Sequence, residues 1–566
     1  MRAGRLSRWA IAILAVALHA PVLSAGFVSD DYVVLAALEH RSPLGNGPLR
    51  LWSFHDGNPE HTRALVLGGG LPWWTEPTAR HAFLRPVSSA LVGVAHALFD
   101  HRAAAYHALS LGVAALDVVV AGAVFARLLP GRAAFIALAS FAFHALHVRP
   151  IEWFSAIHVP LADLLGLVAL LAHLRGRDDG WGPGRWVSTA ALALALLAGE
   201  AGLSTVAWLV AVELLSHGSP RRAVAVLAPQ LAVVAAWAML YRISGSGAGG
   251  IDGYLDPLES PARAMRAILG RGLVEWPRLF IGGSEDLAEV GGEGVLYASG
   301  AAVLVAAALS ALRDSTARRP LGVWTGATVV ASLPALLGPT DRGLYVATFG
   351  AAAALGWATA SAVNVGTGPA RGRVWARISG GLAALVVLTS QVAGGSWTIF
   401  AAARATPSVS REERRGISAL PVPNAANTDV VVLVAESQAM GPWGGVVHAW
   451  KSGERARSWQ ALSLSDGPHR LARVDETTFD LEPYAPGGFD PRIYRDTERH
   501  PLRVGDRFRT PRLQVEVLAT EGGRATRIRV RADRPLEDRG FLWATRSERG
   551  LVQVVMPPIG QSGILL

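Results

Sequence analysis

Long apolar runs separated by arginine-rich turns are the feature that most constrains this chain. They lie near residues 9–25, 104–126, 133–147, 159–174, 186–199, 201–216, 222–242, 293–312, 320–338, 344–364 and 378–396. With 51% hydrophobic and 17% charged residues among 566, most of the chain cannot form an ordinary soluble surface. The sequence therefore predicts a mainly α-helical, polytopic membrane protein.

The arginines set the predicted orientation, because basic residues gather in cytoplasmic loops. They are Arg2, Arg5, Arg8, Arg127, Arg132, Arg175, Arg177, Arg185, Arg221, Arg222, Arg313, Arg318, Arg319, Arg371, Arg373 and Arg377. Their alternation predicts about 11 transmembrane helices, with the amino terminus inside and everything after residue 398 outside. It also requires the apolar stretch Leu84 to Phe99 to be an interfacial helix on the outer face. A cleaved signal peptide ending at Ser24-Ala25 is the alternative for the first run.

Three exterior regions follow from this topology. The domain organisation is a membrane domain of residues 1–400 with extracytoplasmic loops 26–103 and 244–292, a linker of residues 401–422, and an extracytoplasmic β domain of residues 423–566. Within the second loop, Ser260 to Phe280 has the spacing of an amphipathic surface helix. In the β domain, residues 429–435, 512–518 and 525–531 read as strands, with a hairpin turn at 521–524. We expect a β-sandwich-like domain.

The composition excludes several kinds of site. The chain carries 53 basic and 44 acidic residues, and Lys451 is its single lysine, so arginine supplies the excess positive charge. Such an excess is typical of the loops that set membrane topology rather than of a nucleic-acid-binding surface. Cysteine is absent, which excludes disulfides, thiolate metal sites and cysteine nucleophiles. The 61 glycines and the arginine bias indicate GC-rich codons, hence a bacterial inner (cytoplasmic) membrane.

Two adjacent carboxylates, Asp30 and Asp31, follow the first apolar run directly. Neighbouring carboxyl groups at a low-dielectric site can differ in pKa, so one can act as a general base toward a hydroxyl-bearing substrate. Capping of the helix that begins here is the structural alternative, and the two roles are compatible.

Arginines stand at two other exterior turns. Arg85 precedes Pro86 at the start of the interfacial stretch, and Arg342 lies with Asp341 and Tyr345 in a short turn between two apolar runs. A guanidinium matches the phosphate of a lipid head group by charge and by geometry. The alternatives are snorkelling for Arg85 and pairing with Asp341 for Arg342.

Polar residues gather at further outer ends of the runs. His144 and His147 are three residues apart, Glu152 follows them, and Glu200 lies at another outer turn. The histidines fit a substrate-orienting or core role, or a metal site that lacks a recognisable third ligand. For Glu200 the alternative is a solvated loop acid. Asp117, in the middle of a run, is interpreted as a hydrogen-bonded interior residue.

Taken in order, these motifs resemble the GT-C superfamily of integral-membrane glycosyltransferases over residues 1–400. The resemblance is nearest to TMTC-type and bacterial polyprenyl-phosphate-mannose-dependent O-mannosyltransferase-like proteins. The motifs are Asp30-Asp31, Arg85-Pro86, Tyr106-His107, the histidines leading to Glu152-Trp153, Asp163-Leu164-Leu165, Glu200, and Asp341-Arg342 followed by Tyr345.

The resemblance implies inverting transfer of a sugar from a polyprenyl-phosphate donor to an acceptor hydroxyl on the extracytoplasmic face. It implies catalytic roles for Asp30 and Asp31, with Asp30 favoured by the family's usual placement. Donor phosphate or substrate contacts are implied for Arg85, Arg342, Tyr345, His147, Glu152 and Glu200. The pairs His144-Ala145 and Gly199-Glu200 depart from the family's His-Pro and Lys-Glu pairs.

Several questions stay open at the level of sequence. A transporter or flippase of lipid-linked sugars and a degenerate, non-catalytic membrane scaffold are the alternative functions. The acceptor is a glycan, a lipid or a protein, and no nucleic-acid partner is expected. The cofactor is undecided between none and a divalent cation, Mg or Mn, because both kinds of relative occur in the superfamily.

Overall fold

The computed structural model describes residues 2–282, 301, 304–305, 308, 315–338, 341–363, 370–465, 467–484, 488–489 and 493–565. The chain divides into two compact units. The first comprises Met1–Ala25, Arg85–Tyr241 and Pro261–Pro407, and the second comprises Gly26–Leu84, Arg242–Ser260 and Ser408–Leu566. Each unit is therefore built from three separate stretches of chain.

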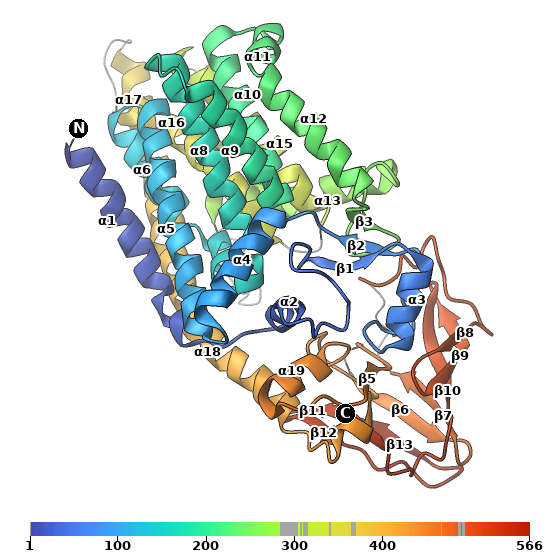
Figure 1. Ribbon diagram of the computed structural model, residues 1–566. Coiled ribbons are helices and arrows are strands. Elements are labelled where there is room, and N and C mark those ends of the chain that lie inside the picture. The colour runs from blue at the N-terminus through green and yellow to red at the C-terminus, as the bar shows by residue number, and fades with distance from the viewer. Residues whose placement is uncertain are drawn as a thin grey trace. The chain divides into compact units, whose positions relative to one another are not determined.

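The first unit is helical (Figure 1). Apolar segments become helices because each then satisfies its own backbone polar groups. Helix α5 packs against α6 and α8, and α8 packs against α9. The helices are α1 (Arg2–His19), η1 (Ala20–Ser24), α4 (Pro86–Phe99), α5 (Ala103–Leu128), α6 (Gly131–Ala142), η2 (Ala145–His147), α7 (Val148–Glu152), η3 (Phe154–Ala156), α8 (His158–Asp178), α9 (Gly184–Ala198), η4 (Glu200–Leu203), α10 (Ser204–His217), α11 (Pro220–Val226), α12 (Ala228–Ile243), α13 (Pro261–Ile281), α15 (Ser315–Leu336), η6 (Asp341–Val346), α16 (Ala347–Val363), α17 (Ala370–Val386), η7 (Val387–Gly394) and α18 (Gly395–Ser418).

Within the described residues, four helices are long and apolar enough to cross a membrane: Leu6–Ser24, Ala103–Leu128, Phe154–Asp178 and Gly380–Ser418. Two bent pairs, Gly131–Ala142 with Ala145–Glu152 and Pro220–Val226 with Ala228–Ile243, raise the number to six if each is one span. A multi-pass helical chain is thus confirmed in outline. The number of 11 crossings stays a prediction, and the run at 293–312 lies largely outside the described residues.

Two helices expected from local patterns are present. Helix α4 starts at Pro86 and has 14 residues, about 21 Å at 1.5 Å per residue, which is less than the roughly 30 Å hydrocarbon core. Helix α13 matches the amphipathic segment, with Ala264 buried and Leu269 and Leu273 exposed. Their positions at the membrane surface stay predictions. The expected linker of residues 401–422 is largely helical, because α18 continues to Ser418.

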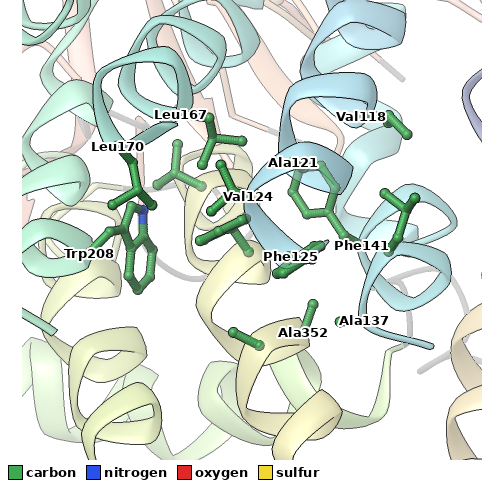
Figure 2. Packing of buried hydrophobic residues seen from close by; sticks show 14 of the residues in the cluster. Val118, Ala121, Val124, Phe125, Ala137, Phe141, Leu167, Leu170, Trp208 and Ala352 are labelled. Carbon is green, nitrogen blue, oxygen red and sulfur yellow. The ribbon is translucent and has the colours of Figure 1, made fainter. Parts of the chain in front are cut away.

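Small and aromatic residues together build the core of the helical unit (Figure 2). The ring of Phe125 stacks on that of Phe349 with centroids 4.6 Å apart, and Trp208 contacts Phe349 at 5.6 Å. A Cβ atom added to Gly350 would lie 2.4 Å from the Trp208 ring, so only glycine lets α16 approach α10 here. Small residues that let helix backbones approach closely are typical of helices packed in a membrane.

The second unit contains three sheets. One is a six-stranded sheet of order β13-β6-β7-β10-β9-β8, one a four-stranded sheet of order β12-β11-β4-β5, and one a three-stranded sheet of order β1-β2-β3. The strands are β1 (Ser53–Asp56), β2 (Arg80–Ala82), β3 (Gly247–Gly249), β4 (Asp429–Val432), β5 (Ser458–Ala461), β6 (His469–Arg473), β7 (Thr478–Pro483), β8 (Arg507–Arg509), β9 (Leu513–Glu521), β10 (Arg524–Ala532), β11 (Phe541–Ser547), β12 (Gly550–Gln553) and β13 (Ser562–Leu565). Its helices are α2 (Asp30–Leu38), α3 (Pro59–Leu67), η8 (Ala425–Asn427) and α19 (Gly444–Ser452).

The carboxyl-terminal region is β-rich as expected, but its four-stranded sheet is mixed. Strands β9 and β10 form the predicted hairpin, whose turn residues Gly522 and Gly523 have φ of 54° and 77°. Strand β4, however, pairs in parallel with both β5 and β11. A parallel neighbour requires a crossover, and α19 supplies it between β4 and β5. A purely antiparallel sandwich is therefore not what this sequence forms.

The first predicted exterior loop is divided between the two units. Residues 26–84 belong with the carboxyl-terminal region, and Arg85 begins a segment of the helical unit. Within the second unit, the indole of Trp73 donates to the carbonyl of Leu462 at 3.0 Å, and Arg495 donates to the carbonyl of Trp74 at 2.8 Å. Both tryptophans are 1% exposed. This loop is thus part of the core of the second unit.

We expect acid to destabilise the second unit. Burial lowers the pKa of His55 and of His469 to about 4, from 6.5. Between pH 6.5 and 4 the unfolded chain therefore binds more protons than the folded chain. The free energy of unfolding is highest above pH 6.5 and falls as the pH drops toward 4, by at most about 3 kcal/mol for each histidine. Tryptophan fluorescence during thermal unfolding of the full chain in detergent, from pH 7.5 to 4.5, measures this loss.

A matched pair of variants isolates the contribution of one histidine. His469→Gln removes the titrating ring, so the melting temperature should depend less on pH than in the wild type. The control His40→Asn changes an exposed histidine at φ 55°, a conformation that asparagine tolerates. An unchanged pH dependence in His469→Gln contradicts this account.

Candidate functional site

The predicted carboxylate pair opens helix α2 of the second unit. Asp31 is 0% exposed, and its Oδ2 accepts a hydrogen bond from the backbone N–H of Val28 at 3.0 Å. Asp30 is only partly buried and accepts a longer contact, 3.4 Å, from the hydroxyl of Ser29. Ser29 is the N-cap residue of α2 and makes no side-chain cap hydrogen bond, so the expected capping is not formed. Asp31 instead bonds the backbone just before the helix, and Asp30 is the more accessible carboxylate.

Aromatic side chains hold the start of α2. The rings of Phe27, Tyr32 and Trp450 contact one another with centroids 5.6–6.1 Å apart. Ser29, at φ 45°, donates its backbone N–H to Glu413 at 2.8 Å. Burial, and after it the charge of Asp30, raises the pKa of the Tyr494 phenol. Asp30 thus acts electrostatically on a buried tyrosine of the same unit.

Arg85 and Glu200 form an ion pair in the helical unit. The Nε and Nη2 atoms of Arg85 both lie 2.8 Å from Oε2 of Glu200, although the residues are 115 positions apart. The hydroxyl of Tyr241 donates to Oε1 of Glu200 at 3.1 Å. The side chains of Arg85 and Glu200 are 10% and 21% exposed. Arg85 is therefore not a snorkelling side chain, and Glu200 is not a solvated loop acid.

A second arginine lies near the same part of the helical unit. Arg342, in η6, places its guanidinium carbon 4.5 Å from the ring centroid of Trp153. His158 is within electrostatic range of both Arg85 and Arg342. Gly199 lies against His158, because a Cβ atom there would be 3.4 Å from Nδ1 of His158. Both η4, which begins at the Arg85 partner Glu200, and η6, which carries Arg342, pack against α8, the helix that begins at His158. The side chain of Asp341 lies outside the described residues.

Tyr345 and His147 lie together inside the helical unit rather than at its surface. Their rings are 4.1 Å apart, and the exposed fractions are 0% and 1%. The hydroxyl of Tyr345 donates to Oδ2 of Asp117 at 2.8 Å, and Nε2 of His147 lies 3.0 Å from the hydroxyl of Thr348. The interpretation of Asp117 as a hydrogen-bonded interior residue is confirmed. Contact of Tyr345 or His147 with substrate stays a prediction.

Glu152 has partners that the sequence did not indicate. Its Oε1 lies 3.0 Å from Nδ1 of His19, and its Oε2 accepts from the hydroxyl of Thr406 at 2.8 Å. These contacts join α7 to α1 and α18. His19 lies inside an apolar run of the sequence. Its position as a single polar residue in that run is the sequence feature that could have identified it.

The metal interpretation of the two histidines has no third ligand in the described part of the chain. The rings of His144 and His147 are 6.0 Å apart, and Nε2 of His144 lies 3.2 Å from the carbonyl of Leu279. Among the described residues, no group of three or more His, Asp or Glu is arranged to hold a metal ion.

Replacing Tyr345 by phenylalanine tests the Asp117 contact. Loss of a hydrogen bond to a buried carboxyl group costs about 1–3 kcal/mol, so we expect the melting temperature of Tyr345→Phe to fall by about 2–6 °C. The control Tyr241→Phe removes a less buried bond, to Glu200, and should shift it less. Equal melting temperatures for Tyr345→Phe and the wild type would contradict the contact.

Comparisons with known proteins give no family assignment. No protein-family model matches the chain, and no curated protein matches it. Solved structures that resemble it include the Archaeoglobus fulgidus oligosaccharyltransferase tethered with an acceptor peptide, at 13% identity over 78% of this chain and 63% of that chain, with a TM-score of 0.38.

Two further structures have comparable scores. ArnT from Cupriavidus metallidurans bound to undecaprenyl phosphate matches at 14% identity over 92% of this chain and 97% of that chain, with a TM-score of 0.37. Arabinosyltransferase EmbB from Mycobacterium smegmatis matches at 14% identity over 85% and 45%, with a TM-score of 0.38. This chain spans less than two thirds of the oligosaccharyltransferase. With TM-scores below 0.5, these similarities assign neither family nor activity.

The predicted site residues thus fall into three groups. Asp30 and Asp31 belong to the second unit. Arg85 and Glu200 contact each other in the helical unit, where η4, which begins at Glu200, and η6, which carries Arg342, both pack against α8. Tyr345, His147 and Glu152 have buried partners in that unit.

Proposed function

We propose that the chain is a glycosyltransferase that moves a sugar, with inversion, from a polyprenyl-phosphate donor to an acceptor hydroxyl on the extracytoplasmic face of a membrane. One observation carries the proposal most directly: η4, which begins at Glu200, the partner of Arg85, and η6, which carries Arg342, both pack against α8. Two guanidiniums gathered at one part of a membrane protein suit a lipid phosphate.

The reaction needs one base and one cationic site. A carboxylate of the Asp30-Asp31 pair takes the proton of the acceptor hydroxyl as its oxygen bonds to the anomeric carbon of the donor. The bond from that carbon to the phosphate oxygen breaks, and the polyprenyl phosphate leaves with the electron pair. Arg85 and Arg342 stabilise the charge that develops on the leaving phosphate. Attack from the face opposite the phosphate inverts the anomeric configuration.

Asp30 fits the base better than Asp31. The carboxylate of Asp31 is 0% exposed and is engaged by the backbone N–H of Val28, which keeps it at the helix start. Asp30 is half-buried. A base must reach the proton that it abstracts, which favours the accessible carboxylate.

Glu200 and Tyr241 give Arg85 a defined orientation. Two donors of its guanidinium engage Oε2 of Glu200, and Tyr241 holds the other oxygen of that carboxylate. A planar guanidinium fixed in this way presents its other edge in one direction. The guanidinium of Arg342 lies over the ring of Trp153. The proposal assigns both guanidiniums to the donor phosphate.

A donor assay tests the proposed activity. The full chain, purified in detergent or placed in liposomes, is given radiolabelled polyprenyl-phosphate sugars together with glycan, lipid and peptide acceptors. We expect release of polyprenyl phosphate that depends on acceptor, and a product of inverted configuration by NMR. Absence of transfer from every donor that the protein binds would defeat the proposal.

A transporter of lipid-linked sugars is the second candidate, favoured by Asp117. This carboxyl group is fully buried in α5, one of the candidate spans, and ionisable residues inside membranes often mark transport paths. Its hydrogen bond from Tyr345 fits the interior role equally well. Movement of a fluorescent lipid-linked sugar across proteoliposomes, without release of polyprenyl phosphate, would favour transport.

A further inference from the structure

A polar pocket of about 260 Å³ opens in the second unit. Its lining residues come from all three chain segments of that unit, and among them are Arg80, Gly249 and Arg499. This volume lies below the roughly 300–1,000 Å³ of sites for drug-sized ligands, so the pocket suits a ligand no larger than a single sugar ring.

The three-stranded sheet forms one wall. Asp56 pairs with Arg80 across β1 and β2, and Arg80 pairs with Gly249 across β2 and β3, so the three residues lie in one row. His81, the next residue of β2, pairs with His55 of β1, and their ring centroids are 5.7 Å apart. Successive side chains of a strand point to opposite faces, so this aromatic contact anchors the strand from behind the pocket.

Glu259 holds two arginines at the rim. Its Oε1 lies 3.0 Å from Nη2 of Arg80, and its Oε2 lies 3.4 Å from Nη1 of Arg499. Arg499 also donates to the backbone carbonyl of Glu259. The pocket therefore has its charged groups in fixed positions before any ligand arrives.

Gly249 lies against the carboxylate of Glu259. A Cβ atom on Gly249 would lie 2.8 Å from Oε1 of Glu259, so alanine here would displace the end of that side chain. Gly250 follows with φ of +68°, and its carbonyl accepts a hydrogen bond from the N–H of Asp496 at 2.8 Å. Bare backbone thus lines this side of the pocket, where a ligand can approach closely.

The charges of the lining indicate the chemistry of the ligand. Arg80 and Arg499 are balanced by Asp56 and Glu259, and His500 and Thr78 add further polar groups. An anion would meet two carboxylates here. A sugar hydroxyl donates to a carboxylate and accepts from a guanidinium at the same time, so alternating donors and acceptors without net charge suit a neutral polyol.

We propose that this pocket binds one sugar ring of a neutral glycan, and that the glycan is the acceptor of the proposed transfer. The binding itself follows from the pocket. Its role as an acceptor subsite rests on the proposed function.

Direct binding is measured on the full chain, in a detergent whose head group is not a sugar. The probes are glucose, mannose, galactose and N-acetylglucosamine, each detected by saturation-transfer NMR, with inorganic phosphate as the anionic comparison. We expect at least one monosaccharide to bind with a Kd in the millimolar range, and phosphate not to bind in the pocket.

Four variants locate the binding. Glu259→Gln loses the charge that orders both arginines, and Gly249→Ala fills the contact, so each should weaken sugar binding tenfold or more. The controls are Glu521→Gln, at the exposed hairpin turn, and Gly47→Ala, which has no atom within 4 Å of the added Cβ. If Gly249→Ala does not fold, the pair Glu259→Gln and Glu521→Gln decides.

The outcomes separate the pocket from the activity. No bound monosaccharide, equal binding in the pocket variants and the controls, or phosphate bound in their place overturns the proposal. Sugar binding that is lost in Glu259→Gln, in a protein without transfer activity, supports the pocket and defeats the proposed function. With an active enzyme, Glu259→Gln should raise the KM for a glycan acceptor and leave kcat unchanged. An unchanged KM overturns the acceptor role.

Discussion

Replacing Asp30 by asparagine is expected to lower the rate of sugar transfer by two to four decades, the usual contribution of a positioned general base. Donor binding and melting temperature should stay near the wild-type values, because asparagine keeps the shape of the side chain and is a good residue for a helix start. A transfer assay at saturating donor, with the released polyprenyl phosphate as readout, measures the effect.

Asp31→Asn is the matched comparison within α2. Asp31 accepts the N–H of Val28 through Oδ2, a bond that the carbonyl oxygen of asparagine can also accept. We expect a loss of activity much smaller than that of Asp30→Asn. Nearly normal transfer in both single variants would defeat the base mechanism, whereas loss in Asp31→Asn alone would move the base to Asp31.

Replacing Arg342 by alanine should weaken donor binding by about one to two decades. A charge-assisted contact to phosphate is worth about 1.5–3 kcal/mol, and each 1.4 kcal/mol is a factor of ten. Lysine should restore binding only in part, because it lacks the planar fork that lies over Trp153. Titration of the purified chain with a polyprenyl-phosphate sugar, with Arg85→Ala studied in parallel, gives the affinities.

Arg127→Ala is the control for this prediction. Arg127 stands in the last turn of α5, is 29% exposed and pairs with Asp179. Its removal deletes the same charge without touching either proposed phosphate ligand, so the donor affinity should not change. Equal affinities for Arg342→Ala, Arg85→Ala and the wild type would remove both arginines from the donor site.

Local patterns predicted the elements of this chain well. The apolar run that contains Ala121 and Val124 forms α5. The segment in which Ile268, Leu269 and Leu273 have helical spacing forms α13. Such patterns work because the hydrophobic period is set by the backbone itself. The parallel pairing of β4 could not be read in the same way, since a run of valines fits a parallel and an antiparallel neighbour equally.

The candidate site was predicted by residue type but not by partner. Arg85 and Glu200 were both singled out, yet nothing in the sequence pairs them across 115 positions. The burial of Tyr345 against Asp117 likewise depends on how η6 packs on α5. Long-range contacts of this kind are fixed by tertiary packing, which a single sequence does not display.

The interleaving of the two units constrains the order in which the protein matures. Residues 26–84 leave the ribosome early, but Leu462 and Arg495, which cover Trp73 and Trp74 in the second unit, are synthesised 389 and 421 residues later. Until then both tryptophans lack their native cover. At 5–20 residues per second, this interval lasts roughly 20–80 s, long enough for a chaperone to be needed. Stop codons before residue 423 should therefore yield a chain in which residues 26–84 are rapidly degraded, even when its helices have been inserted.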